Sequence, residues 1–123
     1  MNVGTSIPLP AYTVDSAFIA RKAEELGFES IWYAEHPAVP VHSDSPFPST
    51  GGEIPWTYSH FSEPYIALAR ASAVTSTIKL GTGITLVPER NPLLLAKEIA
   101  ALDYYSAVSY THLRAHETLR YRV

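Results

Sequence analysis

The feature that most constrains this chain is an alternation of short apolar runs with segments of helical periodicity. Apolar runs near residues 2–7, 29–34 and 78–86 are each followed by a segment whose apolar residues recur at helical spacing. A near-continuous apolar run such as SIWYA is typical of a parallel strand that is covered on both faces. The order therefore predicts an α/β fold of three successive βα units, with the three strands parallel and adjacent in sequence order.

The first predicted helix lies between residues 13 and 26. Thr13 is the expected N-cap, and Gly27 is expected to end the helix. The spacing of Ile19, Ala23 and Leu26 at i, i+4 and i+7 predicts one apolar stripe that faces the sheet.

Two further helices are predicted from their capping residues. Ser62 is the expected cap of an Ala-rich helix over residues 63–75, in which Pro64 is tolerated in the first turn. Asn91 is the expected cap of a helix that starts at Pro92. Its buried face is expected to carry Leu95, Ile99 and Leu102.

Composition excludes several function classes. The chain has 123 residues and no cysteine, so a disulfide scaffold, a thiol nucleophile and a Cys-ligated metal are excluded. A net charge of -3 gives no electrostatic support for binding nucleic acid. No apolar run approaches the roughly 18 residues that a membrane span requires, and the start of the chain does not resemble a secretion signal. We expect a cytoplasmic protein that binds a small molecule.

The segment over residues 37–61 is too long for an ordinary connection between a strand and a helix. It contains five of the chain's ten prolines. Long loops of this kind are usually functional, so we expect a binding loop or lid. Periodicity alone does not decide whether the parallel strands close into a barrel or stay in an open sheet.

Three stretches together resemble the luciferase-like monooxygenase superfamily. They are AEELGFESIWYAEH at 23–36, SEPYIALARASAVTSTIKLGTG at 62–83 and KLGTGITLVPERNPLLLAKEIAALDYYS at 79–106. The resemblance implies a TIM (β/α)8 barrel of which residues 1–106 form the first three βα units. A complete barrel of this type has eight strands and about 250 residues, so the chain by itself is expected to be truncated and inactive.

The loop that carries SPFP and the VPERNPLLLAKE segment resemble the coenzyme F420-dependent oxidoreductase branch. This implies hydride transfer between the deazaflavin and an unknown organic substrate. An FMN-dependent monooxygenase is the alternative within the same fold. A non-catalytic fragment or a flavin-binding barrel is the alternative of another class, and a homodimer remains open for the parent protein.

The resemblance also implies site residues. His36 follows the second strand and is expected to handle a proton beside the flavin ring, as the catalytic residue. Gly81, Thr82, Gly83 and Ile84 end the third strand and are expected to contact the cofactor. In this family the bond between Gly83 and Ile84 is often a non-prolyl cis peptide.

Other polar and aromatic residues have more than one interpretation. Trp56 and Tyr58 are candidates for the substrate pocket, although aromatic residues in a loop more often pack it onto the fold. Glu35 is interpreted as a structural carboxylate, because side chains alternate along a strand. His36, His42 and Asp44 match no compact ligand spacing, so no metal site is expected.

The resemblance ends at Ser106. VSYTHLRAHET at 108–118 matches the translation of a transposon-end adapter that is used in sequencing libraries. We therefore expect residues 107–123 to be a non-native tail that carries no functional residue and packs only opportunistically.

Overall fold

A computed structural model describes residues 2–8, 12–48, 51–106 and 111–112. Strands and helices alternate along it as the sequence predicts. In chain order the elements are β1 (Gly4–Ile7), α1 (Ser16–Glu25), β2 (Ser30–Tyr33), the 3-10 helix η1 (Trp56–His60), α2 (Pro64–Ser72), β3 (Lys79–Thr82), the 3-10 helix η2 (Val87–Glu89), α3 (Pro92–Ser106) and β4 (Thr111–His112).

The sheet is parallel, with strand order β1-β2-β3-β4. This confirms the predicted adjacency of the first three strands. The register pairs Ser6 with Trp32 and Trp32 with Gly81. Strand β3 ends at Thr82, earlier than predicted, because the backbone N–H of Leu86 is bonded to the Glu35 carboxylate instead of to the sheet.

Strand β4 lies in the tail that was expected to pack only opportunistically. Its two residues pair in parallel with Gly81 and Thr82 of β3, so this short part of the tail extends the sheet. The rest of residues 107–123 lies outside the described residues, and the non-native origin of the tail stays a prediction.

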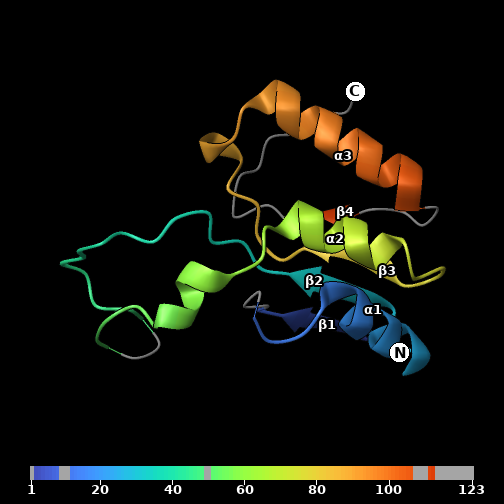
Figure 1. The fold of residues 1–123 in the computed structure, drawn as a ribbon, viewed down its shortest axis with the longest axis horizontal. Coiled ribbons are helices and arrows are strands. Elements are labelled where there is room, and N and C mark those ends of the chain that lie inside the picture. Colours follow the sequence, from blue (N-terminus) through green and yellow to red (C-terminus); the bar gives the residue numbers. More distant parts are fainter. Residues whose placement is uncertain (1, 9–11, 49–50, 107–110, 113–123) are drawn as a thin grey trace.

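The helices form one layer beside the sheet. Figure 1 shows α1, α2 and α3 in chain order, and α2 contacts both of its neighbours. Ile31, Tyr33 and Leu80 are almost fully buried in the core, and the Tyr33 hydroxyl donates to the backbone carbonyl of Ser16 on α1 at 2.8 Å. These strand residues therefore face the helices. The buried residues of α2 and α3 include Ala67, Leu68, Ala71, Leu95 and Leu102.

 Leu95 and Leu102 lie on the predicted face of α3, with Ile99 partly buried beside them, which confirms that face.

Helix α1 differs from the prediction at its cap and in its apolar stripe. The N-cap is Asp15, not Thr13, because the Asp15 carboxylate accepts from the backbone N–H of Ala17 at 2.7 Å. The buried stripe is Ser16, Ala20 and Ala23, whereas Leu26 is 73% exposed. Small residues on the buried stripe let α1 approach its neighbours closely.

The other helix ends test the capping predictions one by one. Glu63, not Ser62, caps α2, and its carboxylate accepts from the backbone N–H of Ile66 at 2.9 Å. Asn91 caps α3 as predicted, because its side-chain oxygen accepts from two backbone N–H groups in the first turn. Gly27 follows α1 with a φ of 80°, a left-handed conformation that favours glycine and ends the helix as predicted.

The face of the sheet opposite the helices carries the small residues Gly4, Ser6, Ser30 and Gly81 together with the larger Trp32 and Lys79. Alternation along the strands and the register place these residues together. The Trp32 indole N–H donates to the Ser30 hydroxyl at 2.9 Å. A Cβ on Gly4 would lie 2.3 Å from the Ser30 Oγ, so Trp32 and Ser30 already fill the space over Gly4.

A single carboxylate oxygen joins α1 to the turn before β3. The Glu24 Oε1 accepts from the backbone N–H groups of Ser76, Thr77 and Ile78 at 2.9, 2.6 and 2.9 Å, and from the Thr77 hydroxyl at 2.9 Å. Burial acts to raise the pKa of Glu24, but these hydrogen bonds outweigh it and lower the pKa to about 2. The ionised carboxylate therefore stabilises the start of β3.

We predict that Glu24→Gln lowers the Tm of the complete protein by about 2–4 °C at neutral pH, because the amide lacks the charge that strengthens these bonds. The folded-state pKa lies below the ordinary value, so the stabilisation is present above that value and is lost as the pH falls through about 2. Thermal unfolding of both proteins between neutral and acid pH measures this. The control is Glu25→Gln, which removes only an exposed ion pair with Lys22; a Tm difference that does not change with pH would contradict the prediction.

Candidate active site

The predicted catalytic residue and the predicted cofactor segment meet at one edge of the sheet. His36 follows β2, and Gly83 follows β3, the neighbouring parallel strand. The backbone N–H of Gly83 donates to the backbone carbonyl of Tyr33 at 2.7 Å, which continues the ladder by one bond. The carboxyl ends of the strands therefore bring His36 and residues 83–84 to the same edge, where parallel barrels build their active sites.

His36 lines a cavity of about 360 Å³. Its ring packs edge-on against the ring of Tyr58, with centroids 4.6 Å apart, and against that of Phe61 at 5.3 Å. Tyr58 and Phe61 stack on each other at 4.9 Å. The remaining lining residues are Glu35, Pro37, Phe61, Glu63, Pro64, Glu89 and Arg90.

The surroundings of His36 set its protonation state. Partial burial among the aromatic rings lowers the pKa of His36, and the negative charge of Glu35 opposes this with a smaller effect. At neutral pH the imidazole is therefore mainly neutral, and its free nitrogen is able to accept a proton. This is the state that a general base requires.

Glu35 is a structural carboxylate, as its position in the strand indicated. Its side chain is 1% exposed. One carboxylate oxygen accepts from the backbone N–H of Leu86 at 2.7 Å, and the other accepts from the Nε of Arg90 at 2.9 Å and from its Nη2. The residue next to His36 is thus bonded to the segment that follows β3.

Arg90 links the Glu35 carboxylate to further groups, and it is not among the predicted site residues. Its Nη2 donates to the Glu63 carboxylate at 2.7 Å, and its guanidinium lies 4.8 Å from the centroid of the Tyr65 ring. Burial acts to lower the pKa of Arg90, but the hydrogen bonds to Glu35 and Glu63 prevail and raise it. The signal for such a partner was Glu35 itself, because a carboxylate buried after a strand requires a cation.

The predicted cofactor residues differ in how they are placed. Gly83 is half-buried and Ile84 is 47% exposed, so both are accessible at the strand ends. Thr82 is fully buried, and its hydroxyl accepts from that of Thr85 at 2.8 Å. Gly81 is also buried. Of the four predicted cofactor residues, Gly83 and Ile84 are therefore accessible, whereas Gly81 and Thr82 are buried.

Two details of the segment after β3 were not predicted. No cis peptide occurs among the described residues, so the bond between Gly83 and Ile84 is trans, in contrast to the expectation from the resemblance. Ser6 of β1 lies close by, since its Oγ is 3.7 Å from the position that a Cβ on Gly83 would occupy. No pattern in the sequence pointed to Ser6.

The two predicted pocket aromatics lie in different clusters. Tyr58 contacts His36, as a pocket residue would. Trp56 is 67% exposed and stacks on Tyr12, with ring centroids 5.3 Å apart and planes within 5°. His60 packs edge-on against both of these rings. Trp56 therefore packs η1 against the segment after β1, whereas Tyr58 packs against the ring of His36.

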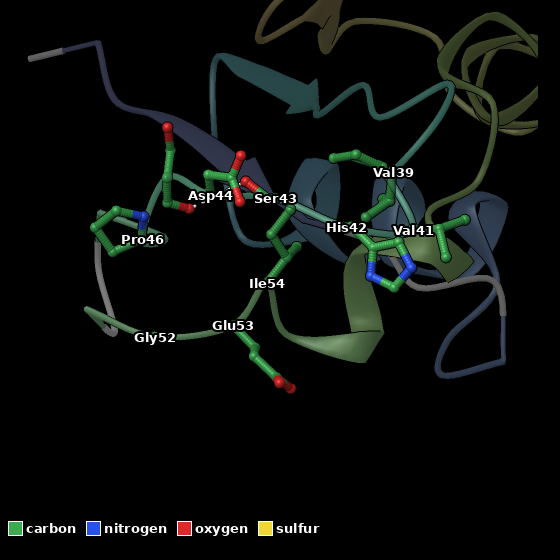
Figure 2. A pocket seen from close by; sticks show the side chains of 11 residues that line it. Val39, Val41, His42, Ser43, Asp44, Pro46, Gly52, Glu53 and Ile54 are labelled. Carbon is green, nitrogen blue, oxygen red and sulfur yellow. Dashed lines mark hydrogen bonds between the residues drawn. The ribbon is translucent and has the colours of Figure 1, made fainter.

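The long loop encloses a second cavity, of about 620 Å³. Figure 2 shows the side chains of His42, Asp44 and Glu53 among its lining residues. His36 lines the other cavity, so His36, His42 and Asp44 do not form one cluster. Within the described part of the chain, no group of three or more acidic or histidine side chains is placed to hold a metal ion.

In the part of the chain that the structure describes, no helix is both long enough and apolar enough to cross a bilayer.

Comparison with known proteins gives one family match and several relatives. The family described as luciferase-like monooxygenase matches residues 10–107. An uncharacterized protein of Mycobacterium tuberculosis is 40% identical over 95 residues, which are 76% of this chain and 34% of the relative. The chain thus spans about a third of the length of this curated relative.

Two solved structures share the fold. The coenzyme F420-dependent tetrahydromethanopterin reductase of Methanopyrus kandleri aligns with a TM-score of 0.63 and 26% identity, over 90% of this chain and 26% of the reductase. The FMN-bound oxygenating constituent of 3,6-diketocamphane monooxygenase from Pseudomonas putida aligns with a TM-score of 0.64 and 17% identity, over 95% of this chain and 30% of that protein. These likenesses confirm the predicted fold, the N-terminal part of a TIM barrel.

We predict that Gly83→Ala leaves the Tm of the complete protein nearly unchanged but weakens ligand binding at the strand ends. A Cβ on Gly83 would meet only the Tyr33 carbonyl oxygen at 3.5 Å and the Ser6 Oγ at 3.7 Å, which are ordinary contacts. The added methyl group therefore costs little in folding and occupies space beside Ser6. Thermal unfolding and ligand titration measure the two effects.

Gly4→Ala is the matched control for that substitution. Its Cβ would lie 2.3 Å from the Ser30 Oγ, so this variant should lose stability instead. Unchanged ligand affinity in Gly83→Ala would show that residues 83–84 do not contact the ligand.

Proposed function

This chain belongs to the luciferase-like monooxygenase family, and on that premise we propose that the complete protein is a coenzyme F420-dependent oxidoreductase. The substrate is a small organic molecule. The observation that carries the proposal is that His36, whose pKa is lowered by partial burial, and the accessible Gly83 and Ile84 follow two adjacent parallel strands at the same edge of the sheet.

The residues present are compatible with a planar cofactor ring. Gly83 has no side chain, and the space where its Cβ would lie is bordered only by the Tyr33 carbonyl and the Ser6 hydroxyl. Ile84 exposes an apolar side chain next to it, and such a side chain packs well on the face of a ring. Groups that hold a cofactor phosphate would come from the part of the barrel that this chain does not include.

The chemistry that the deazaflavin supplies when bound is two-electron transfer, as a hydride exchanged with a substrate carbon. His36 handles the proton that accompanies this transfer, because a neutral imidazole accepts it from the substrate as the hydride leaves. Tyr58 and Phe61 cover the ring of His36 and keep water away from part of it. Glu35 holds the backbone beside His36 through its bonds to Leu86 and Arg90.

The second candidate is an FMN-dependent monooxygenase with the same fold. It is favoured by the FMN-bound neighbour, a likeness of fold alone at 17% identity, whereas the F420-dependent neighbour is 26% identical. Titrating the complete protein with F420 and with FMN, followed by absorbance, separates the two candidates. Binding of FMN in preference to F420 would overturn the proposal, and binding without turnover of any substrate would favour a non-catalytic barrel.

We predict that His36→Asn lowers kcat roughly a hundredfold or more while the Kd for the cofactor changes little, because the amide does not accept a proton as imidazole does. Steady-state kinetics and cofactor titration on the complete protein measure the two quantities. His42→Asn is the matched control, since His42 lines the loop cavity and not the cavity of His36. Near-normal turnover of His36→Asn at saturating substrate would defeat the catalytic assignment.

A further inference from the structure

We infer that Arg90 is a positioning residue, whose guanidinium fixes His36 relative to residues 83–86 by holding Glu35 and Glu63 together. This inference rests on the proposed function of His36. It adds a residue that lies outside the set the sequence predicted for the site.

The first step is the bond between the ends of β2 and β3. Glu35 is adjacent to His36 in the chain, and its Oε2 accepts from the backbone N–H of Leu86. Its Oε1 is occupied by the Nε and Nη2 of Arg90. Because both oxygens are held, the carboxylate has little freedom to turn, and the backbone at His36 is tied to the segment that contains Gly83.

Arg90 also binds the segment between η1 and α2. Glu63 accepts from the Arg90 Nη2 with its Oε1 and from the backbone N–H of Ile66 with its Oε2. It therefore caps α2 and binds Arg90 at once. Phe61, two residues earlier, packs against the His36 ring. Arg90 thus connects the segments that border His36 on both sides.

Burial and geometry make this role specific to arginine. The Arg90 side chain is 19% exposed, against 56% for Arg70 in its ion pair with Asp15. A guanidinium presents its N–H groups in a fixed planar fork and binds two carboxylates in defined directions, whereas a lysine ammonium is a point charge on a flexible stem. Arg90→Lys therefore keeps the charge and loses the geometry.

Loss of the fork changes the surroundings of His36 in a predictable direction. Glu35 is left as a buried carboxylate with weaker pairing, and the segments around His36 are free to separate. More water then reaches the ring of His36, which is already exposed in part. In Arg90→Gln the Glu35 charge also acts on the ring without the opposing cation. Both effects raise the pKa of His36 from its lowered value. The other charged groups that line the cavity are Glu63 from the start of α2 and Glu89 from η2, and Tyr58 of η1 packs against the His36 ring.

The test compares Arg90→Lys and Arg90→Gln with Arg70→Gln in the complete protein. Titration of the His36 ring by NMR, without cofactor, is expected to show a higher pKa in both Arg90 variants and no change in Arg70→Gln. In turnover assays we expect kcat to fall at least about tenfold, since small misplacement of a catalytic group is costly. The substrate KM and the cofactor Kd should stay within about twofold of wild type.

The NMR titration decides the inference even if the proposed reaction is wrong, because it needs neither cofactor nor substrate. An unchanged His36 pKa in Arg90→Lys overturns the inference, whatever happens to turnover. If Arg90→Gln fails to fold, Arg90→Lys, which retains the charge, supplies the answer. A shifted pKa without F420 turnover in the wild-type protein supports the positioning role and refutes the proposed function.

Discussion

The buried carboxylate of Glu35 is the constraint on which the active-site edge depends. A charge with 1% exposure has lost its hydration, at a cost of several kcal/mol unless it is paired and hydrogen-bonded. The chain meets that requirement with the Leu86 N–H and with Arg90. Both partners come from the segment after β3, so the path of this segment follows from the need to satisfy Glu35. The early end of β3 and the position of His36 are consequences of the same bonds.

The periodic parts of the fold could be predicted from the sequence, because burial leaves a repeating pattern. The three parallel βα units and the buried face with Leu95 and Leu102 follow from that pattern. The pattern does not identify the buried stripe of α1, because that stripe is formed by small residues such as Ser16 and Ala20. Leu26 was predicted to be buried because it is large and apolar, but it is exposed. The cap of α3, Asn91, was predicted correctly, but the caps of α1 and α2 were not. Thr13 and Asp15 are both good caps, and the hydrogen bond to Ala17 distinguishes them.

The candidate site could be predicted only in its local parts. His36 and Gly83 could be selected as candidates because Gly83 directly follows β3 and His36 lies shortly after the end of β2 at Tyr33. Arg90 is 55 residues from Glu35 in the sequence, and no local pattern indicates which distant cation pairs with a buried carboxylate. Ser6 was missed because its proximity to Gly83 depends on how three strands curve together. Trp56 and Tyr58 are two residues apart on η1 yet contact different clusters, which the spacing of a short 3-10 helix does not resolve.

The face of the sheet opposite the helices is filled at one end and less crowded at the other. Trp32 and Ser30 fill the space over Gly4, towards the beginning of β1. At the other end Ser6 has a small side chain and Gly83 has none. The less crowded end is the one at which His36 lies. Arg90 lines the cavity of His36, but its guanidinium is already bonded to both Glu35 and Glu63. The proton transfer that we propose for His36 therefore depends on the imidazole itself and on the rings that pack against it.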